Sequence, residues 1–350
     1  MIQHIFIMLG DACNISCRYC MQHPLVTKRL GRKISNRVYQ FINRAIAING
    51  GPCITLYGGE PLLYFPAIKE IVLRYPSLDF GIISNCKALS QDIVDFCNEH
   101  DICIALSYDG YNVMKTRGYN AVKEKLPLLL QLKRFCLTGV MTPYSYPLDL
   151  LDAFEDVDKL YFAKHNKHIG VNIDLVRDTG WHIKDLLEFD YDKLECQLRL
   201  LVTEYLGHIY KNTDAPYTHI AYMQRIVDQL YNSDAGKMSK GVFCGNGTTV
   251  MNIDLDGNLY PCHNTTTSIG DIDTPAMEYM AALDKFDTTP ERRQRVCRDC
   301  KVLPMCRGGC MLVNDLSYYC KLRKAYYGTI MDALESYAKE HANDISSTDS

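Results

Sequence analysis

Three cysteines just after a short apolar run are the most informative feature of the chain. Residues 4–20 read HIFIMLGDACNISCRYC, in which Cys13, Cys17 and Cys20 have the spacing C-x3-C-x2-C. The apolar residues 5–9 predict a β-strand, and the cysteines follow it in a loop. Three thiolates this close together can bind three irons of a 4Fe-4S cluster and leave the fourth iron open. Zinc is the alternative, but zinc usually takes four ligands, and only His23 lies nearby.

The composition favours a metal-binding protein over a disulfide scaffold. The chain has 350 residues, of which 16 are cysteines and 47% are hydrophobic, and its formal net charge is -3. Disulfide scaffolds are short secreted chains with more than roughly 8–10% cysteine, so that class is excluded. The charge gives no overall attraction to nucleic acid or to membranes, and no apolar run is long enough to span a bilayer. We therefore expect a cytoplasmic protein whose clustered cysteines bind metal.

The first half of the chain alternates between short apolar runs and amphipathic helical stretches. Strands are predicted at residues 5–9, 53–57, 80–84, 102–107, 135–141 and 169–175. Helices are predicted at residues 36–49, 67–74, 91–100, 121–133 and 148–162, with a kink at Pro127. Six such units favour an α/β fold, a partial (β/α)6 TIM-like barrel. A flat doubly wound sheet is the alternative, because periodicity alone does not separate the two.

The pattern changes after residue 180. Two helical stretches, 191–212 and 219–232, follow one another without a strand, and seven of the 16 cysteines lie within residues 244–320. Asp256-Gly257 predicts a β-hairpin between residues 250–255 and 258–260. We therefore divide the chain into a partial barrel (1–180), a helical bridge (181–243), a small cysteine-rich domain with a hairpin and helices (244–320), a C-terminal helix (321–342) and a disordered tail (343–350).

The C-x3-C-x2-C loop after the first strand of a βα barrel resembles the radical S-adenosylmethionine (radical SAM) superfamily. The resemblance implies a 4Fe-4S cluster on Cys13, Cys17 and Cys20, whose open iron binds the amino and carboxylate groups of S-adenosylmethionine. An electron then cleaves the sulfonium and gives a 5′-deoxyadenosyl radical. The resemblance also implies that Tyr19 packs near the adenine of the cofactor.

A second motif follows the second predicted strand. Residues Gly58, Gly59, Glu60 and Pro61 form the GGEP sequence that the same superfamily carries at this place. The two glycines allow the backbone to approach a ligand closely. The resemblance implies that the Glu60 carboxylate receives the ammonium group of the cofactor, since strand ends at this face of a barrel form the active site.

Weaker matches follow the third and fourth predicted strands. Ser84 and Asn85 stand where the family has Thr-Asn-Gly, with Cys86 in place of the glycine, and an ordinary turn is the alternative interpretation. Residues 107–110 read SYDG and resemble the family's Ser-x-Asp-Gly. The resemblance assigns Ser107 and Arg117 to the ribose or the carboxylate of the cofactor.

The cysteine-rich part of the chain resembles the SPASM extension of radical SAM enzymes, which carries two auxiliary 4Fe-4S clusters and would bring the total to three. The resemblance assigns four cysteines to an outer cluster and three to an inner one: Cys297, Cys300, Cys306 and Cys320 to the outer, Cys244, Cys262 and Cys310 to the inner. Zinc knuckles are the alternative for this spacing. The remaining six, Cys53, Cys86, Cys97, Cys103, Cys136 and Cys196, are expected to pack in the core.

Two departures from sulfatase-maturing relatives concern the inner cluster. Those relatives have a fourth cysteine shortly after the position of Cys244, where this chain reads GNGTT at residues 245–249. The inner cluster is therefore expected to have an open iron or a ligand other than cysteine. The relatives also place a catalytic aspartate directly after the equivalent of Cys262, and this chain has His263. His263 is a candidate base, iron ligand or hydrogen-bond donor beside the cluster, and its presence argues against formylglycine formation.

The resemblance implies an enzyme that modifies a ribosomal precursor peptide or a protein. Hydrogen abstraction from a substrate residue would be followed by oxidation and crosslinking, with the auxiliary clusters accepting the electron. The crosslink is a thioether if a substrate cysteine binds the open iron, and a carbon-carbon or carbon-oxygen bond otherwise. Because the first strand begins near residue 5, a separate leader-binding protein is an expected partner, as is an electron donor of the flavodoxin or ferredoxin type.

Four other functions are alternatives for this sequence. A sulfatase-type protein maturase and a small-molecule radical dehydrogenase are the enzymatic alternatives. An iron-sulfur electron carrier and a zinc-binding adaptor are the alternatives that are not enzymes. The GGEP motif and the three-cysteine loop argue against the last two, because neither function needs a cofactor clamp.

Overall fold

Nine strands form one sheet in the structure, a computed structural model that describes residues 2–22, 33–178, 183–234, 249–265, 267–313 and 316–340. The strands are β1 (His4–Met8), β2 (Cys53–Tyr57), β3 (Phe80–Ser84), β4 (Cys103–Ser107), β5 (Phe135–Met141), β6 (Gly170–Leu175), β7 (Val250–Asp254), β8 (Asn258–Tyr260) and β9 (Gly270–Asp271). Their order in the sheet is β6-β5-β4-β3-β2-β1-β7-β8-β9. All six strands predicted for the barrel are present, with ends that differ by one residue at most.

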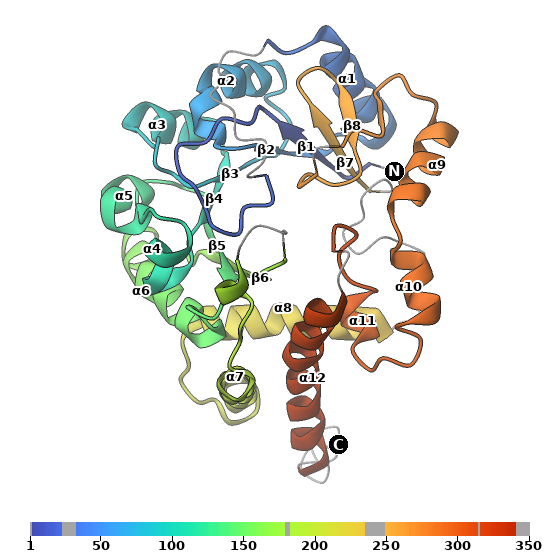
Figure 1. The fold of residues 1–350 in the computed structure, drawn as a ribbon. Coiled ribbons are helices and arrows are strands. Elements are labelled where there is room, and N and C mark those ends of the chain that lie inside the picture. The colour runs from blue at the N-terminus through green and yellow to red at the C-terminus, as the bar shows by residue number, and fades with distance from the viewer. Residues whose placement is uncertain are drawn as a thin grey trace, which may run out of the picture.

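Strands β1 to β6 form a partial barrel. Each pairs in parallel with the next along the chain, so the strand order never reverses. A doubly wound sheet would reverse its order and carry helices on both faces. Figure 1 shows instead a curved sheet whose connecting helices lie on its outer side. The predicted partial barrel is thus confirmed, and the flat sheet is excluded.

Twelve α-helices are described: α1 (Asn36–Asn49), α2 (Phe65–Arg74), α3 (Gln91–Glu99), α4 (Val113–Thr116), α5 (Ala121–Leu129), α6 (Pro147–His165), α7 (Tyr191–Lys211), α8 (Tyr217–Asp234), α9 (Ala276–Phe286), α10 (Thr289–Arg295), α11 (Leu303–Cys306) and α12 (Leu316–Glu340). Helix α5 ends four residues earlier than predicted, with Pro127 in its last turn rather than at a kink. Helix α12 begins five residues before the predicted limit of 321, so Cys320 lies within it. Three-residue or four-residue 3₁₀ turns occur at Pro61–Tyr64, Gly110–Asn112 and Lys184–Leu186.

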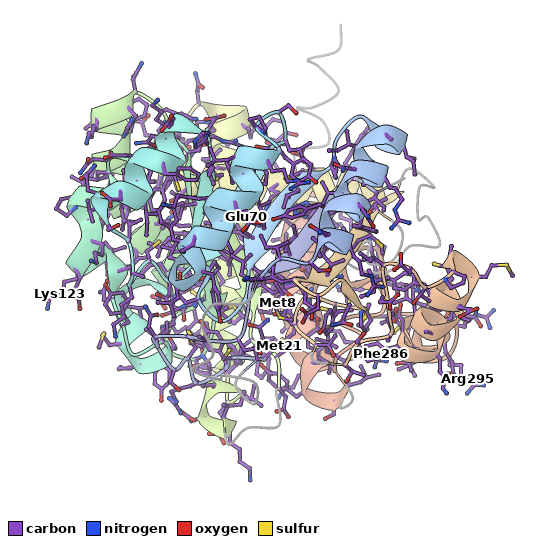
Figure 2. All side chains as sticks on the ribbon, turned by 90° about the horizontal axis from the view of Figure 1, so that it is seen from above. Met8, Met21, Glu70, Lys123, Phe286 and Arg295 are labelled. Carbon is purple, nitrogen blue, oxygen red and sulfur yellow. The ribbon has the colours of Figure 1, made fainter. Side chains whose placement is uncertain are left out.

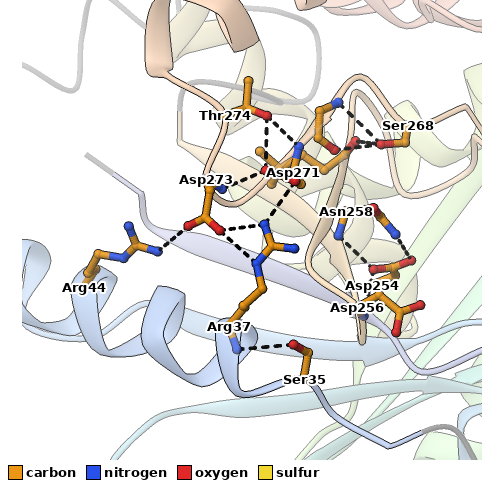
Figure 3. A network of polar contacts seen from close by, with 12 residues as sticks. Ser35, Arg37, Arg44, Asp254, Asp256, Asn258, Ser268, Asp271, Asp273 and Thr274 are labelled. Carbon is orange, nitrogen blue, oxygen red and sulfur yellow. Dashed lines mark hydrogen bonds and ion pairs between the residues drawn. The ribbon is translucent and has the colours of Figure 1, made fainter.

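The predicted hairpin at Asp256-Gly257 forms, but it does not stand apart from the barrel. Strand β7 pairs antiparallel with β8 and also parallel with β1, so the hairpin extends the barrel sheet. Asp254 accepts hydrogen bonds from the backbone N–H groups of Asp256 and Asn258, which closes the turn. Outside the hairpin, Arg37 of α1 pairs with Asp271 and Asp273 beyond β8 (Figure 3). These contacts hold the cysteine-rich part against the first helix.

The core lies between the sheet and its outer helices. Along β1 and β2 the fully buried side chains Ile5, Ile7, Ile54 and Leu56 occupy alternate positions and belong to the main apolar cluster. Seen from above in Figure 2, Met8 and Met21 lie near the middle of the molecule, while Arg295 of α10 projects from one side. Every helix in the described part of the chain is too short or too polar to cross a membrane.

Candidate active site

The cysteine loop lies at the carboxyl end of β1, over the mouth of the barrel. Cys13, Cys17 and Cys20 are half-buried and line one cavity of about 360 Å³. Residues from the ends of all six barrel strands, or from the loops that follow them, line the same cavity, as do residues that follow β8. Active sites of barrel enzymes form at this face, because the loops there converge on one space. The cavity is therefore the candidate active site.

Most residues predicted to bind the cofactor line this cavity. They are Tyr19, Gly58, Gly59, Ser84, Asn85, Ser107 and Arg117, and the cavity is also lined by the candidate base His263. Glu60 and Pro61 are not among its lining residues. Pro61 instead begins the 3₁₀ turn that follows the motif.

The two glycines of the GGEP motif are needed for contact with the cysteine loop. The Gly59 N–H donates to the Gly10 carbonyl at 2.9 Å, and the Glu60 N–H donates to the Ala12 carbonyl at 2.8 Å. A Cβ on Gly59 would lie 2.4 Å from the Ala12 oxygen, and one on Gly58 would lie 2.3 Å from the Gly10 oxygen. Only glycine fits at this distance. The sequence predicts that these glycines let the backbone approach a ligand closely. In the structure they let it approach the backbone of the cysteine loop.

Glu60 is fully buried and holds the neighbouring strand end. Its carboxylate accepts hydrogen bonds from the Ser84 hydroxyl at 2.6 Å, the Asn85 N–H at 2.8 Å and the Leu62 N–H at 3.1 Å. Burial raises its pKa to about 7, although these donors oppose the rise. Three internal donors thus surround the carboxylate, and Glu60 is not among the residues that line the cavity. Its contact with the ammonium group of the cofactor stays a prediction.

The turn after β3 has the left-handed backbone that favours glycine, the residue that the family motif has at this place. Cys86, which replaces that glycine, has a φ of 56°, in the left-handed region. Its N–H donates to the Ser84 hydroxyl at 2.8 Å, which supports the strained backbone. The Asn85 amide then reaches the cysteine loop, 2.9 Å from Asn14 Oδ1 and 3.8 Å from Cys13 Sγ.

A buried ionic network joins the end of β4 to the cysteine loop. Asp109 accepts hydrogen bonds from the Tyr19 hydroxyl at 2.5 Å and the Thr116 hydroxyl at 2.7 Å, and pairs with Arg117 Nε at 3.0 Å. Arg117 in turn places Nη1 3.9 Å from Cys17 Sγ. The sequence pointed to the SYDG motif but assigned no role to Asp109. Two features of the sequence could have identified Asp109: it is a carboxylate just after a buried strand, and an arginine follows it.

His263 lies against the barrel interior, directly after Cys262. Its ring stacks on Phe6 with centroids 4.6 Å apart and meets Tyr57 edge-on at 5.4 Å. The Tyr57 hydroxyl and the Gln22 amide both donate to its carbonyl. Burial lowers the pKa of the imidazole to about 4. The side chain is thus held in the cavity wall by aromatic contacts on one face and one edge.

Polar side chains on β5, on β6 and just after β6 form another part of the cavity wall. Thr138, Asn172, Asp174 and Arg177 line it. Arg177 Nη2 lies 3.5 Å from Asp174 Oδ1, and Arg225 of α8 donates to Asn172 Oδ1 at 2.6 Å. These groups can hydrogen-bond a polar chain that enters the cavity, and sequence reasoning gave no role to either arginine.

Four cysteines of the C-terminal array meet in one place. Cys297, Cys300, Cys306 and Cys320 line a second, small cavity. Cys262 and Cys310 are buried elsewhere, whereas Cys244, His23 and the tail at residues 343–350 lie outside the described residues. In the described part of the chain, no three His, Cys, Asp or Glu side chains are arranged to hold a single metal ion.

The thiols of both groups suit a multi-iron cluster. Burial raises the pKa of Cys17 to about 12, against the effect of Arg117, and the neighbouring Cys20 and Cys13 add to the rise. In the second cavity, burial raises the pKa of Cys306 to about 11, and three nearby thiols again contribute. Three cysteines on one loop and four cysteines in one cavity are donor sets that iron-sulfur clusters take. Both groups of donors therefore fit 4Fe-4S clusters.

Two family models match the chain. A 4Fe-4S single cluster domain model matches residues 5–115, and the SPASM model, an iron-sulfur cluster-binding domain, matches residues 244–301. The chain is 21% identical to a cysteine-type anaerobic sulfatase-maturating enzyme of Clostridium perfringens, over 91% of this chain and 93% of that protein. It is 22% identical to a serine-type anaerobic sulfatase-maturating enzyme of Klebsiella aerogenes, over 93% of this chain and 84% of that protein.

Solved structures share the fold. Native anSMEcpe with bound AdoMet and Cp18Cys peptide matches with a TM-score of 0.68 at 18% identity, over 96% of this chain and 99% of that one. SuiB of Streptococcus suis bound to its precursor peptide SuiA matches with a TM-score of 0.57 at 17% identity, over 89% of this chain and 72% of that one. The radical SAM and SPASM domains imply S-adenosylmethionine and several 4Fe-4S clusters as cofactors. The chain therefore carries a radical SAM domain and a C-terminal SPASM domain, and it is an enzyme of the radical SAM type.

Proposed function

We propose that the enzyme is a peptide maturase that crosslinks a residue of a ribosomal precursor peptide, and that His263 accepts a proton in that reaction. One observation carries the proposal: His263 lies in the cavity wall with the three cysteines of the first loop. Peptides are bound in two of the similar structures, anSMEcpe and SuiB. A polar wall on β5, on β6 and just after β6 suits the backbone of such a peptide.

The proposal assigns the cysteines as follows. Cys13, Cys17 and Cys20 hold the first cluster, and the outer and inner auxiliary clusters take the two sets of cysteines that the sequence suggests. When bound, the first cluster and S-adenosylmethionine supply the 5′-deoxyadenosyl radical, and the auxiliary clusters take up an electron. The division of the chain into a partial barrel, a helical bridge and a cysteine-rich domain, with limits at residues 180 and 243, belongs to the same proposal, and the last helix begins at Leu316.

The residues of the chain have distinct tasks in this reaction. Ser107 and Arg117 bind the cofactor, while Asn172 and Arg177 orient the peptide through its polar groups. A crosslink removes two hydrogens from the peptide: one leaves as a hydrogen atom from a C–H bond, and the other leaves as a proton. One electron then passes from the substrate to an acceptor. The proton is the part that a side chain of this enzyme must accept.

His263 is placed to accept it. Burial lowers the pKa of the imidazole to about 4, so the ring is neutral and keeps one nitrogen lone pair before the substrate enters. The Phe6 ring fixes the plane of the imidazole, and Asn264 Nδ2 lies 3.1 Å from its Nε2 atom. The Asn264 amide can turn its oxygen toward Nε2 and accept a hydrogen bond there once the ring carries the proton. His263 thus occupies the position at which sulfatase-maturing relatives carry an aspartate.

The test is a His263→Gln variant assayed with a precursor peptide and a reductant. We expect 5′-deoxyadenosine to form while the crosslinked product falls at least tenfold. His4→Gln is the matched control, because His4 also stacks on Phe6, at 4.5 Å, but does not line the cavity. Full crosslinking by the His263 variant would overturn the role of this residue.

A sulfatase-type maturase is the second candidate, because the matched curated relatives carry that name. The two functions give different products from a cysteine-containing peptide. Mass spectrometry separates formylglycine, which has lost the cysteine sulfur, from a crosslink, which keeps the sulfur and lacks two hydrogens. Formylglycine as the main product would overturn the crosslinking proposal.

The crosslink itself has one specific form in this proposal. An open iron of the inner cluster would bind a substrate thiolate and favour a thioether. Cys262 and Cys310 are the described cysteines assigned to that cluster. A crosslinked product in which every substrate cysteine remains free would exclude the thioether and leave the carbon-carbon or carbon-oxygen bond.

A further inference from the structure

The small cavity that collects four cysteines also contains two positive side chains. Arg323 and Lys324 line it together with Cys297, Cys300, Cys306 and Cys320. Cys320 and Arg323 are three residues apart on α12, and Lys324 is four residues from Cys320, so all three lie on one side of the helix. The two cations differ in one respect: Arg323 is only 3% exposed, whereas Lys324 is exposed.

Tyrosine side chains hold the Arg323 guanidinium in a fixed orientation. Nη1 donates to the Tyr327 hydroxyl at 2.9 Å, and Nη2 donates to the Tyr319 hydroxyl at 2.6 Å. Its central carbon also lies 4.9 Å from the Tyr319 ring and 5.4 Å from the Tyr327 ring. Both tyrosines belong to α12, so one helix carries the cation, its two anchors and one of the four thiols.

A buried cation has a stronger effect on its surroundings than an exposed one. Burying a guanidinium costs free energy that nearby negative charge can offset. The thiolates of a bound cluster would supply that charge, and Arg323 lines the same cavity as the four cysteines. Water and salt screen an exposed charge such as Lys324 much more effectively.

We propose that Arg323 raises the reduction potential of the outer auxiliary cluster. The cluster is thereby a better electron acceptor than it would be without this buried charge. The proposal rests on the assignment of Cys297, Cys300, Cys306 and Cys320 to one cluster. Reduction adds one electron to the cluster, and the buried guanidinium stabilises the extra negative charge. Arg323 touches no substrate and acts only through the potential, so it is a positioning residue.

The experiment is a redox titration of the reconstituted, full-length enzyme, followed by electron paramagnetic resonance. Arg323→Gln removes the charge and should move the midpoint potential of the outer cluster to a more negative value. Arg323→Lys keeps the charge and should shift it less. Lys324→Gln is the matched control, since it removes an exposed charge from the same cavity, and it should give the smallest shift. An Arg323→Gln potential equal to that of the wild type or of Lys324→Gln would overturn the proposal.

Two further variants keep the outcome decisive. If Arg323→Gln does not assemble the cluster, Arg323→Met removes the charge and keeps a long side chain that suits the buried site, so it should still lower the potential; an unchanged potential would again overturn the proposal. A Cys297→Ala/Cys300→Ala double variant tests the assignment separately. If the titrated signal persists in that variant, the cysteine assignment is wrong, whatever Arg323 does.

Discussion

The Tyr19 hydroxyl donates a hydrogen bond to the Asp109 carboxylate at 2.5 Å, across 90 residues of sequence. Tyr19 lies between Cys17 and Cys20, and Asp109 lies just after β4. The bond therefore fixes the cysteine loop to the barrel. Because Asp109 also pairs with Arg117, one buried carboxylate positions both the loop and a cavity cation.

Removal of the Asp109 charge should destabilise the protein strongly. Asp109→Asn leaves the buried Arg117 without its counter-charge, and loss of one partner of a buried pair costs about 3–5 kcal/mol. Asp185→Asn is the control, since it breaks the exposed ion pair between Arg18 and Asp185. The side chains of these two residues are 39% and 44% exposed. That change should cost less than about 1 kcal/mol. Denaturant unfolding of both variants measures the difference, and equal losses would contradict the prediction.

Gly59→Ala should displace the cysteine loop. The added Cβ would meet the Ala12 carbonyl at 2.4 Å, and a clash with backbone is relieved only when one segment moves. Overpacking of this kind costs about 1–3 kcal/mol. Iron content and S-adenosylmethionine binding should both fall. In Gly81→Ala the nearest atom would be Thr55 Oγ1 at 3.5 Å, so this variant should keep both, and a similar loss in it would show that the clash is not the cause.

The buried Glu60 carboxyl should make stability depend on pH. Its pKa rises from 4.5 to about 7 on folding, so the folded state holds the proton more tightly than the unfolded state. The stabilisation is complete below pH 4.5 and is lost as the pH rises toward 7, a change of about 3 kcal/mol at most. The measurement compares wild type with Glu60→Gln in the absence of iron and S-adenosylmethionine. The stability difference should shift in favour of the Gln variant as pH rises, and a constant difference would refute the prediction.

Cysteines of the two groups should affect different steps. Cys17→Ala should abolish 5′-deoxyadenosine formation, because two thiols of that loop no longer hold the first cluster. Cys300→Ala should keep part of that activity but lose peptide turnover. Cys196 is exposed on α7, and Cys196→Ala should leave both activities and the iron content unchanged. Chromatography of the nucleoside and mass spectrometry of the peptide measure the two steps; turnover by Cys300→Ala at the wild-type rate would contradict the assignment.

Local patterns predicted the barrel strands well. Strands β2, β3 and β5 have the predicted limits, because each is a short apolar run between turn residues. Helix ends were less predictable. Helix α12 begins at Leu316, before the cysteine that was expected to precede it, since packing of that helix against α7 extends it beyond its local signals.

Contacts between distant segments could not be read from spacing. The hairpin at Asp256-Gly257 is a local signal, but its pairing with β1 depends on which sheet edge is free to accept it. The hydrogen-bond partners of the Glu60 carboxylate also depend on the folded chain, because its three donors come from two segments that are distant in sequence.

The order of motifs along the chain was enough to predict the βα units, the cysteine groups and the resemblance to radical SAM enzymes, because strand periodicity and close thiol spacing are properties of adjacent residues. Periodicity left open whether the units form a partial barrel or a flat sheet, and the strand order of the folded chain decided it. Tertiary structure decided which side chains share the cavity with those cysteines. Asp109, His263 and Arg177 meet the cysteine loop only after the sheet has curved, and Arg323 joins four thiols only after α12 has packed. Burial and charge pairing exist only in the folded chain, so the chemistry of these groups follows from the fold.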